Sequence, residues 1–414
     1  MLNVSLERLK SRLDFLSTLT DPNLPFTRRA FTARYLEGRN WLEREFQKAG
    51  LGTQTDAGGN LIGRLEGKSP KALVLGSHTD SVRSGGRFDG ILGVLSALET
   101  VQTLLENGVK PNHSLEVVDF LSEEPSDYGG LSCVGSRTWA GTLSGPMLAL
   151  ENADGETLEQ AMKRMGADLE RVRSGPLRRP EELAAYLELH IEQGPTLEHA
   201  GIPIGVVTGI AGIERWKLSV LGQADHAGTT PMTLRKDALV GAAQVVLELN
   251  TLAGATPNIV ATIGKLELSP GAANVVPERV DLLTDTRSIH SAALECFNTN
   301  FLERSKVLLE SAGLGFSFER VSQSTPTVCN ARVLSATRAG ATRRGYKWLE
   351  LPSGAGHDGT HLSSLCPVGM IFVPSVGGRS HTPEELTLEG DILAGTEVLL
   401  EILLELDGVM DGKI

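Results

Sequence analysis

The order in which helical and strand-like patterns alternate constrains the fold of this chain more than any other feature. Apolar residues recur every three or four positions in some segments, which predicts amphipathic helices, whereas short apolar runs between turns predict buried strands. The helical segments are 2–16, 31–49 and 90–106, and the strand-like segments are 60–67, 71–78 and 113–124. Helices alternating with strands are typical of a mixed or parallel sheet with helices on its faces.

A different pattern interrupts this alternation between residues 211 and 327. It runs strand, helix, strand, strand, helix, strand, which is the order of a ferredoxin-like unit of about a hundred residues. Helix–strand alternation then returns, with a buried strand at 370–375 and a terminal helix at 390–406. We therefore predict the α/β class: a mixed-sheet domain made of 1–210 and 328–414, interrupted by a smaller α+β domain at 211–327.

Composition limits the partners that the chain can bind. Its 414 residues carry a net charge of −12 without any basic run, which argues against nucleic acid and membrane surfaces, because proteins bind these through Lys/Arg clusters. No apolar stretch approaches the roughly 20 residues of a membrane span, and the N-terminus lacks the apolar core of a signal peptide. The four cysteines show no C-x-x-C spacing, which favours reduced thiols over disulfides. We expect a soluble, cytoplasmic protein.

Side chains that can bind metal follow predicted strands in five separate segments. These segments are GSHTDSV, GRFDG, LSEEP, LELHIEQGP and RSHTPEE, and they carry His78, Asp89, Glu124, His190 and His381. In open α/β sheets, ligands gather beyond the carboxyl ends of the strands. Imidazoles with carboxylates suit zinc, manganese or cobalt, and two such ions about 3.5–4 Å apart can activate one water and polarise a carbonyl. A single histidine is more often an ordinary surface or core residue, so the hypothesis rests on the conjunction of all five.

The residues around these candidate ligands suggest how the site is organised. Asp89 suits a bridge between two cations, because neighbouring glycines let its loop approach them closely, although an Asp in such a loop is usually a turn former. Asp80 follows His78 by two positions and fits a carboxylate that orients a metal-bound imidazole. Of the adjacent acids Glu123 and Glu124, one can bind metal while the other acts as general base, although such pairs are usually solvated surface residues.

Taken together, HTDSV, RFDG, SEE, LELHIEQGP and SHTPEE resemble the M20 metallopeptidase family. The motifs LHIEQGP, ADHAGTTPM, ANVVP, DTRS and SGAGHDG are similar to its hydantoinase/carbamoylase branch, which contains N-carbamoyl-L-amino acid hydrolases, β-ureidopropionases and allantoate amidohydrolases. The resemblance covers essentially the whole chain, in the same order. It implies a di-metal hydrolase domain, an inserted ferredoxin-like dimerisation or lid domain, a homodimer, and two divalent ions per subunit (zinc, manganese, cobalt or nickel).

The resemblance also implies roles for single residues. One metal would be held by His78, Asp89 and His190, and the other by Asp89, Glu124 and His381. Glu123 would be the general base. His357, in SGAGHDG, would support the metal ligands without binding the metals itself.

Further residues are expected to contact the substrate. His226 would stabilise negative charge that develops on the carbonyl oxygen, and Gln193 would contact the ureido end. Asn274 and Arg287 would fix the rest of the substrate, since a guanidinium pairs bidentately with a carboxylate. Each has an alternative: Arg287 can pair with Asp285, Asn274 can be a turn residue, and His226 can be a solvated loop residue.

We predict that the chain hydrolyses an N-carbamoyl-L-amino acid to the amino acid, ammonia and carbon dioxide. The alternatives are an allantoate amidohydrolase, a β-ureidopropionase, an aminoacylase or peptidase of the M20 family, and a non-catalytic amino-acid-binding homologue. The loop SEEPSDYGGLSCVGSR departs from the pattern of many branch members, and Pro125 stiffens it. This departure leaves the substrate more open than the reaction type, and the donor set does not select one native metal.

Overall fold

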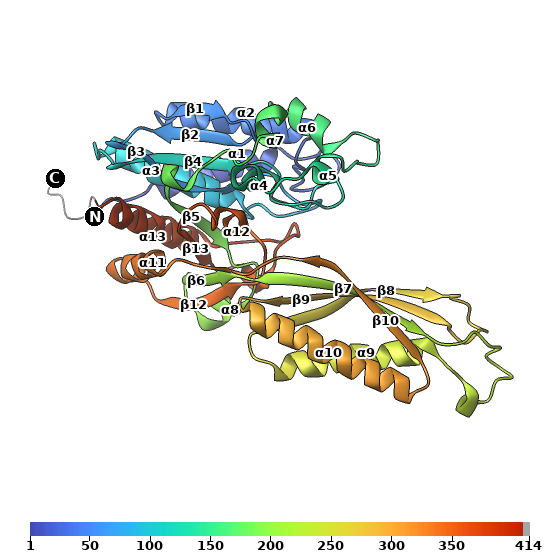
Figure 1. Cartoon of the computed structure of the whole chain (residues 1–414). Helices are drawn as coiled ribbons and strands as arrows, with labels where there is room; N and C mark the ends of the chain where they lie inside the picture. The colour runs from blue at the N-terminus through green and yellow to red at the C-terminus, as the bar shows by residue number, and fades with distance from the viewer. Residues whose placement is uncertain (409–414) are drawn as a thin grey trace. The chain divides into compact units, whose positions relative to one another are not determined.

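The computed structural model describes residues 1–408, which form two compact units (Figure 1). Unit 1 comprises Met1–Thr208, Cys329–Ser353 and residues 357–408, and unit 2 comprises Gly209–Val328 and Gly354–Gly356. The segment 211–327, predicted as an inserted domain, lies within unit 2. The predicted fold class, a mixed-sheet α/β domain with a separate antiparallel α+β domain, is confirmed.

The larger sheet has nine strands in the order β1-β2-β4-β3-β5-β13-β6-β11, with β12 also pairing with β6. The strands are β1 (Gly52–Thr55), β2 (Leu61–Leu65), β3 (Ser69–His78), β4 (His113–Phe120), β5 (Leu183–Ile191), β6 (Ile204–Ile210), β11 (Thr327–Val328), β12 (Trp348–Ser353) and β13 (Val368–Val373). The four central strands β4, β3, β5 and β13 are parallel. Their carboxyl ends therefore lie at one edge of the sheet, where the residues that follow them come together.

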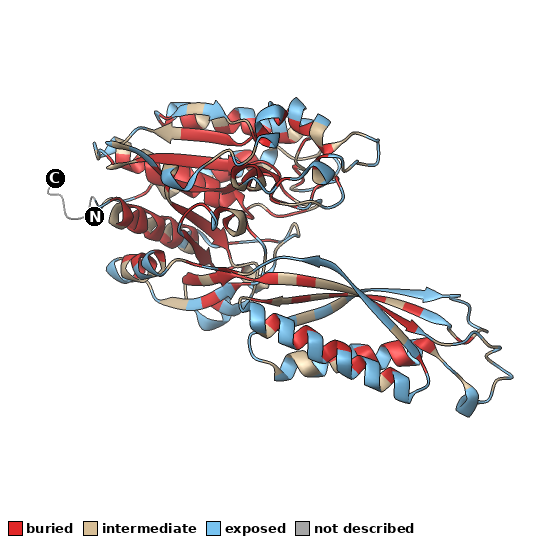
Figure 2. Ribbon diagram, viewed as in Figure 1, coloured by how far each residue is buried: buried red, intermediate tan, exposed pale blue. Residues whose placement is uncertain are grey.

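Both faces of the central strands are buried, which explains their nearly continuous apolar sequences. The side chains of β3 alternate between two cores. Leu73 and Leu75 join one core cluster, whereas Ala72 and Val74 join another, which contains Trp139. Figure 2 shows this buried sheet with its covering helices. The rigid core fixes the strand ends that carry the candidate site.

Helices cover the larger sheet and fill the connections. The longer ones are α1 (Leu6–Thr18), α2 (Ala33–Lys48), α3 (Ile91–Glu106), α11 (Ala331–Arg343) and α13 (Glu389–Asp407). The short ones are α4 (Val134–Ala140), α5 (Gly145–Leu148), α6 (Leu158–Arg164), α7 (Leu169–Arg173), α8 (Thr196–Ala200) and α12 (Gly359–Leu362), with 3₁₀ turns at Pro180–Glu182, Met232–Leu234 and Val376–Gly378. The sequence pattern predicts α1, α2, α3 and α13 within a few residues, but it does not reveal α4 to α7.

Unit 2 contains a four-stranded antiparallel sheet in the order β10-β7-β9-β8, with two helices. Its elements are β7 (Gly212–Leu221), α9 (Ala238–Ala255), β8 (Val260–Ser269), β9 (Arg279–Ser288), α10 (Ser291–Ser311) and β10 (Gly315–Gln323). This is the predicted β-α-β-β-α-β order. The central strand β9 alternates strictly between buried and more exposed side chains, because only one face of the sheet is covered by helices.

Helix α9 is long and apolar enough to cross a membrane when judged by length and composition alone. Its residues Ala242, Val245 and Leu249, however, are buried in the core of unit 2 against the sheet. The helix is therefore a packed element of a folded unit, and its length and composition alone are only weak support for a membrane span. Its outer face remains exposed (Figure 2).

Candidate metal centre

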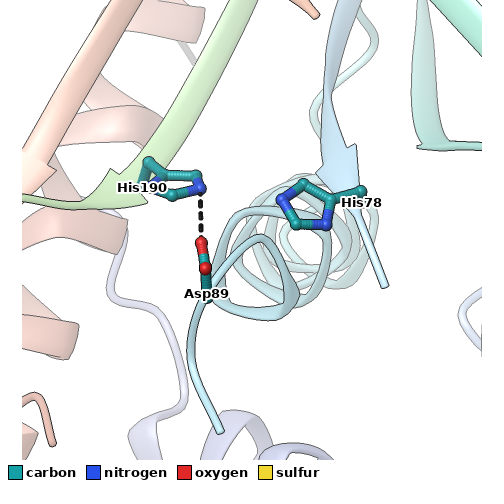
Figure 3. A group of neighbouring side chains, drawn as sticks. All are labelled: His78, Asp89 and His190. Atoms are coloured by element: carbon teal, nitrogen blue, oxygen red, sulfur yellow. Dashed lines mark ion pairs between the residues drawn. The ribbon is translucent and has the colours of Figure 1, made fainter. Parts of the chain in front are cut away.

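Three groups of side chains among the described residues can bind a metal ion: two of them share Asp89 at the carboxyl edge of the larger sheet, and the third is Glu188, His190 and His357. In the first group His78, Asp89 and His190 each offer one ligand atom, and these atoms lie within 4.8 Å of one another; the second group, Asp89, Glu124 and His381, meets the same criterion. Asp89 belongs to both groups. Figure 3 shows the first group, with the rings of His190 and His78 on either side of the Asp89 carboxylate. The structure thus brings all five predicted ligands together.

The contact between His190 and Asp89 indicates that a cation belongs between them. His190 lies at the end of β5, and its Nδ1 is 2.9 Å from the Ile191 carbonyl oxygen, so the neutral ring carries its proton there. In this tautomer the lone pair of Nε2 faces Asp89 Oδ1 at 3.1 Å, so the contact is a hydrogen bond only when Nε2 carries a second proton. Two acceptors in this arrangement repel each other unless a proton or metal ion lies between them. The imidazole and carboxylate donors fit a divalent ion such as zinc or manganese.

Asp80 organises the site in a different way from the one expected. His78 Nδ1 lies 3.1 Å from the backbone oxygen of Asp80 and 3.6 Å from its carboxylate, so the backbone carbonyl is the closer orienting group. The two carboxylate oxygens accept hydrogen bonds from the backbone N–H groups of Glu123 and Glu124, each at 3.2 Å. Asp80 therefore holds the loop after β4, and with it both candidate acids.

His381 completes the second group from the loop after β13. Its Nε2 lies 3.0 Å from Asp89 Oδ2 and 3.2 Å from Glu124 Oε1. The side chain is 47% exposed, whereas those of Asp89 and Glu124 are 6% exposed, so this group is open to solvent on one side. A substrate can therefore reach it.

The pKa values of Asp89 and His381 are shifted because carboxylates and imidazoles stabilise each other's charged forms. Burial alone would raise the pKa of the Asp89 carboxyl, but hydrogen bonds with His190 and His381 outweigh it and hold this pKa well below its ordinary value. Hydrogen bonds to Asp89 and Glu124 raise the pKa of His381 to about 11. In the metal-free chain His381 thus retains a proton that a metal ion has to displace.

Glu123 points at the same site from beside Glu124. Its Oε2 lies 3.6 Å from His78 Nε2, and its Oε1 accepts a weak hydrogen bond from the thiol of Cys133 at 3.6 Å. Cys133 precedes α4 in the left-handed conformation (φ 55°), which turns the chain back toward Glu123. Cys133 carries no metal-binding spacing, so the sequence gives no sign of its place beside Glu123.

Burial raises the pKa of the Glu123 carboxyl well above its ordinary value. The nearby His78 opposes this shift, whereas the buried acid Asp358 adds to it. Asp358 itself accepts a hydrogen bond from Ser136 Oγ at 2.5 Å. A carboxyl with a raised pKa is suited to accept and return a proton.

Gln193 and His357 lie beside candidate metal ligands. The side-chain nitrogen of Gln193 donates a hydrogen bond to Asp89 Oδ2 at 3.1 Å, while its oxygen is buried and has no partner among the described residues. The His357 ring packs nearly edge-on against His190, with ring centroids 4.6 Å apart, and its Nε2 lies 2.9 Å from Ser353 Oγ. Gln193 thus contacts a candidate metal ligand directly and keeps one acceptor free.

His226 and Asn274 are neighbours in unit 2. The ring nitrogen Nδ1 of His226 accepts hydrogen bonds from the backbone N–H groups of Gly228 and Thr229, at 3.0 and 3.2 Å. The neutral ring therefore carries its proton on Nε2, as a donor to an oxygen would require. The backbone of Ala227 pairs with that of Asn274 (2.9 Å), which places the two predicted substrate-binding residues side by side.

Arg287, on β9, pairs with Asp285, which is one of the two interpretations that the sequence allows. Its Nε and Nη2 donate to the two Asp285 oxygens at 2.6 and 3.2 Å, and its Nη1 donates to the Gly354 carbonyl at 2.7 Å. A guanidinium has five N–H donors, so two remain for an anion. The aspartate also fixes the direction in which these donors point.

The fold and the site together are those of a hydrolase. Imidazoles and carboxylates cluster at the edge of a mixed sheet, and a separate unit has the ferredoxin-like order of strands and helices. The model of the peptidase family M20/M25/M40 matches residues 74–405. With the relatives described next, this match shows that the chain belongs to the M20 family, in its hydantoinase/carbamoylase branch. The resemblance seen in the motifs is confirmed.

The relatives cover almost the whole chain. An N-carbamoyl-L-amino acid amidohydrolase from Geobacillus stearothermophilus is 41% identical over 97% of this chain and 98% of its own length. An allantoate amidohydrolase from Bacillus subtilis is 34% identical over 92% of each chain. The crystal structure of a hydantoinase/carbamoylase family amidase from Burkholderia multivorans superposes with a TM-score of 0.90, at 34% identity over 98% of each chain. The chain is an amidohydrolase of this branch, as the motifs predict.

Proposed function

We propose that the chain hydrolyses N-carbamoyl-L-amino acids with the help of two divalent metal ions, held by His78, Asp89 and His190 and by Asp89, Glu124 and His381. The observation that carries the proposal is the pair of ligand groups that share Asp89, with the buried Glu123 beside them. The relative with 41% identity, which has this activity by name, supports the choice of substrate class. Zinc, manganese, cobalt and nickel all suit such donors.

When bound, two such ions supply a Lewis acid for the carbonyl and make water acidic enough to react near neutral pH. The Glu123 carboxylate takes a proton from the attacking water and returns it to a leaving nitrogen. Its backbone N–H is held by Asp80 at 3.2 Å, so the base keeps its position during both transfers. One water and one ureido group give the free amine, ammonia and carbon dioxide.

The substrate contacts come from both units in this proposal. In unit 1, the free side-chain oxygen of Gln193 accepts an N–H of the ureido group. In unit 2, the Nε2–H of His226 stabilises charge on the carbonyl oxygen, and the remaining donors of Arg287 bind the carboxylate, with Asn274 beside His226. His357 keeps the His190 ring in place by packing against it.

An allantoate substrate is the second candidate, supported by the Bacillus subtilis relative. Both substrates contain a ureido group and a carboxylate, so the same site residues serve either one. The loop that follows Glu124 departs from the branch pattern. Within it, Tyr128 is buried against Phe31, with ring centroids 5.3 Å apart, so its side chain is a core residue rather than a selector of the substrate.

We also infer a cytoplasmic homodimer. The edge strand β8 exposes Val260, Leu266 and Leu268, and the helix α9 beside it exposes Val240 and Leu247. An exposed apolar face next to an unpaired strand edge is unfavourable in water. A second copy of the chain suits this surface, because two antiparallel β8 strands can pair with each other and extend both sheets.

The proposed function is tested by metal reconstitution followed by a substrate panel. The purified chain is stripped with a chelator and reloaded with zinc, manganese, cobalt or nickel, and ammonia release is measured. The panel contains N-carbamoyl-L-amino acids, their D-enantiomers, allantoate, 3-ureidopropionate, N-acetyl amino acids and dipeptides. We expect the highest kcat/KM for an N-carbamoyl-L-amino acid, and activity only with metal.

Two outcomes decide between the candidates. A higher kcat/KM for allantoate assigns the second candidate function, with the same metal site. Full activity of the stripped chain in the presence of chelator contradicts the metal-dependent mechanism altogether. Binding of amino acids without any turnover by the metal-loaded chain indicates the non-catalytic homologue.

A further inference from the structure

Glu385 is a buried carboxylate in the loop after β13, and neither the predicted nor the proposed roles use it. It follows His381 by four positions in RSHTPEE, and the residue is 3% exposed. An unpaired carboxylate is costly to bury, so its partners have to compensate for the loss of water. Three uncharged groups, two backbone N–H groups and one hydroxyl, donate hydrogen bonds to its carboxylate.

These donors come from the two loops that supply metal ligands. Glu385 Oε1 accepts hydrogen bonds from the backbone N–H groups of Phe88 and Asp89, at 2.8 and 3.1 Å. Its Oε2 accepts one from Ser380 Oγ at 2.8 Å. Ser380 directly precedes His381, and its Oγ also lies 3.5 Å from Asp89 Oδ2. One carboxylate thus ties the loop of Asp89 to the loop of His381.

Gly86 leaves room for the Glu385 carboxylate. A Cβ atom added to Gly86 would lie 1.9 Å from the carboxyl carbon and from one carboxyl oxygen of Glu385. The glycine therefore leaves the space that the carboxylate fills, three residues before Asp89. Glycine at this position is explained by the close approach of Glu385, since its φ is not in the left-handed region.

We propose that Glu385 is a positioning residue for the metal centre: it holds the backbone of Asp89 and the Ser380–His381 turn at a fixed separation, so that both ligand groups can bind metal together. The inference rests on the proposed two-metal function. Hydrogen-bond partners behind the ligands of a metal typically change affinity or activity by about 10- to 100-fold when removed. Glu385 acts through Asp89 and His381 and does not itself touch the substrate.

The test compares three variants of the whole chain. Glu385→Ala removes all three hydrogen bonds, whereas Glu385→Gln keeps an oxygen that can accept from Phe88 and Asp89. Glu384→Ala is the matched control, because Glu384 is its neighbour but pairs at the surface with Arg379, 3.2 Å away, and its side chain is 60% exposed. Cobalt(II) binding is titrated against a chelating dye, with the visible spectrum of the bound ion recorded, and kcat and KM are measured separately.

We expect Glu385→Ala to lose about 10- to 100-fold in affinity for at least one ion and to show a changed cobalt spectrum. Its kcat should fall at saturating substrate, with little change in KM. Glu385→Gln should recover most of the affinity and spectrum, because its amide oxygen can still accept hydrogen bonds. If the negative charge itself were required, Glu385→Gln would be impaired as much as Glu385→Ala. Glu384→Ala should match the unmutated chain in every measurement.

Two further variants test the contact between Glu385 and Gly86, and Gly86→Ala also provides a test on its own if Glu385→Ala does not fold. Gly86→Ala keeps the carboxylate but places a methyl group where it lies, so we expect the same loss of metal affinity. In the double variant Gly86→Ala/Glu385→Ala the clash is absent, and the loss should be smaller than the product of the two single effects. Full multiplicativity contradicts a direct steric contact.

The result that overturns the inference is a folded Glu385→Ala chain with unchanged cobalt affinity, spectrum and kcat. The unmutated chain is titrated in parallel. If it binds no metal, the proposed function itself is wrong; if it binds two ions and Glu385→Ala binds them equally well, only the role of Glu385 is wrong.

Discussion

Asp89 is the residue on which the candidate site depends most. Each of its carboxylate oxygens faces an imidazole nitrogen, that of His190 at 3.1 Å and that of His381 at 3.0 Å. A single carboxylate with one oxygen for each of two cations is what a bridging ligand requires. Its backbone N–H donates a hydrogen bond to Glu385 at 3.1 Å. The side chain is thus held by two imidazoles and the backbone by Glu385.

The variant Glu123→Gln separates catalysis from metal binding. Glutamine keeps the size of the side chain and the acceptor for the Cys133 thiol but cannot take up a proton. Because a general base contributes about 10²- to 10⁴-fold, we expect kcat to fall within this range while both metal ions stay bound. Ammonia release and metal analysis of the same sample provide the measurement. A variant that keeps more than a tenth of the activity would contradict the assignment of the base.

The pH dependence of metal binding tests the charges within the cluster. The pKa of His381 is raised to about 11, so at pH 7 the metal-free ring is protonated and an incoming ion has to displace that proton. Raising the pH removes the proton and strengthens binding, roughly tenfold per pH unit for each proton displaced. We expect apparent affinity to keep rising between pH 7 and 9 in chelator-buffered titrations.

An ordinary histidine, with a pKa near 6.5, would already be deprotonated above pH 7.5. A plateau of affinity above this pH would therefore show that the imidazoles are not held in their protonated form by Asp89 and Glu124. Proton release on metal addition, followed with an indicator dye, gives an independent count of the protons that the metal displaces.

The sequence predicts which residue types meet, but not all of their contacts. Five candidate ligands were identifiable because imidazoles and carboxylates follow strand ends, and these ends converge in any parallel sheet. Three sets of contacts could not be predicted: those of Asp80 with the amides of Glu123 and Glu124, that of the Cys133 thiol with Glu123, and those of Glu385 with the backbone near Asp89. They depend on distances between remote segments, which no local pattern contains.

At the scale of elements, the start of α3 determines how the Asp89 loop meets β3. Gly90 precedes the helix with φ 68°, and a Cβ atom there would lie 2.3 Å from Nε2 of His78. The glycine therefore allows the helix to begin directly beneath a candidate metal ligand. A side chain would push the His78 ring away from Asp89 and His190.

A matched pair of variants tests this close approach. Gly108 has the same φ of 68°, but a Cβ atom there would meet nothing within 4 Å. Both Gly90→Ala and Gly108→Ala pay the cost of a positive φ, about 1–2 kcal/mol, whereas only Gly90→Ala displaces His78. Gly90 has ψ −44°, outside the left-handed helical region, so we expect Gly90→Ala to lose more stability than Gly108→Ala. A loss of metal affinity is expected only in Gly90→Ala. Equal metal affinities, measured by dye competition, would contradict the contact.

Long elements were predictable and short ones were not. Helices such as α3 and α13, with 16 and 19 residues, span several turns, so apolar residues repeat often enough to reveal the period. Helices α4 to α7 have 7, 4, 7 and 5 residues and cover two turns or fewer. Their positions depend on packing against a core that contains Tyr35 and Leu121, which periodicity does not show.

At the scale of the whole molecule, the two units carry different parts of the proposed site. The candidate metal ligands belong to unit 1, whereas His226, Asn274 and Arg287 belong to unit 2. The interruption of one α/β domain by a ferredoxin-like unit was visible in the sequence because the order of strands and helices changes.

The proposed dimer is tested on the exposed face of α9. Leu247 is 66% exposed there, and Val307 on α10 is 67% exposed, which makes it a matched control. A buried, unpaired charge at an interface costs roughly 2 kcal/mol or more, so Leu247→Glu should weaken the dimer at least about 30-fold. Val307→Glu should leave it intact. Light scattering after size-exclusion chromatography distinguishes the two; a monomeric unmutated chain would contradict the dimer.

The central claim, that one aspartate bridges two metal ions, is tested most directly by anomalous diffraction from crystals of the zinc- or manganese-loaded chain. We predict two anomalous peaks about 3.5–4 Å apart, one contacted by His78, Asp89 and His190 and the other by Asp89, Glu124 and His381. A single peak, or ions bound away from Asp89, would contradict the account.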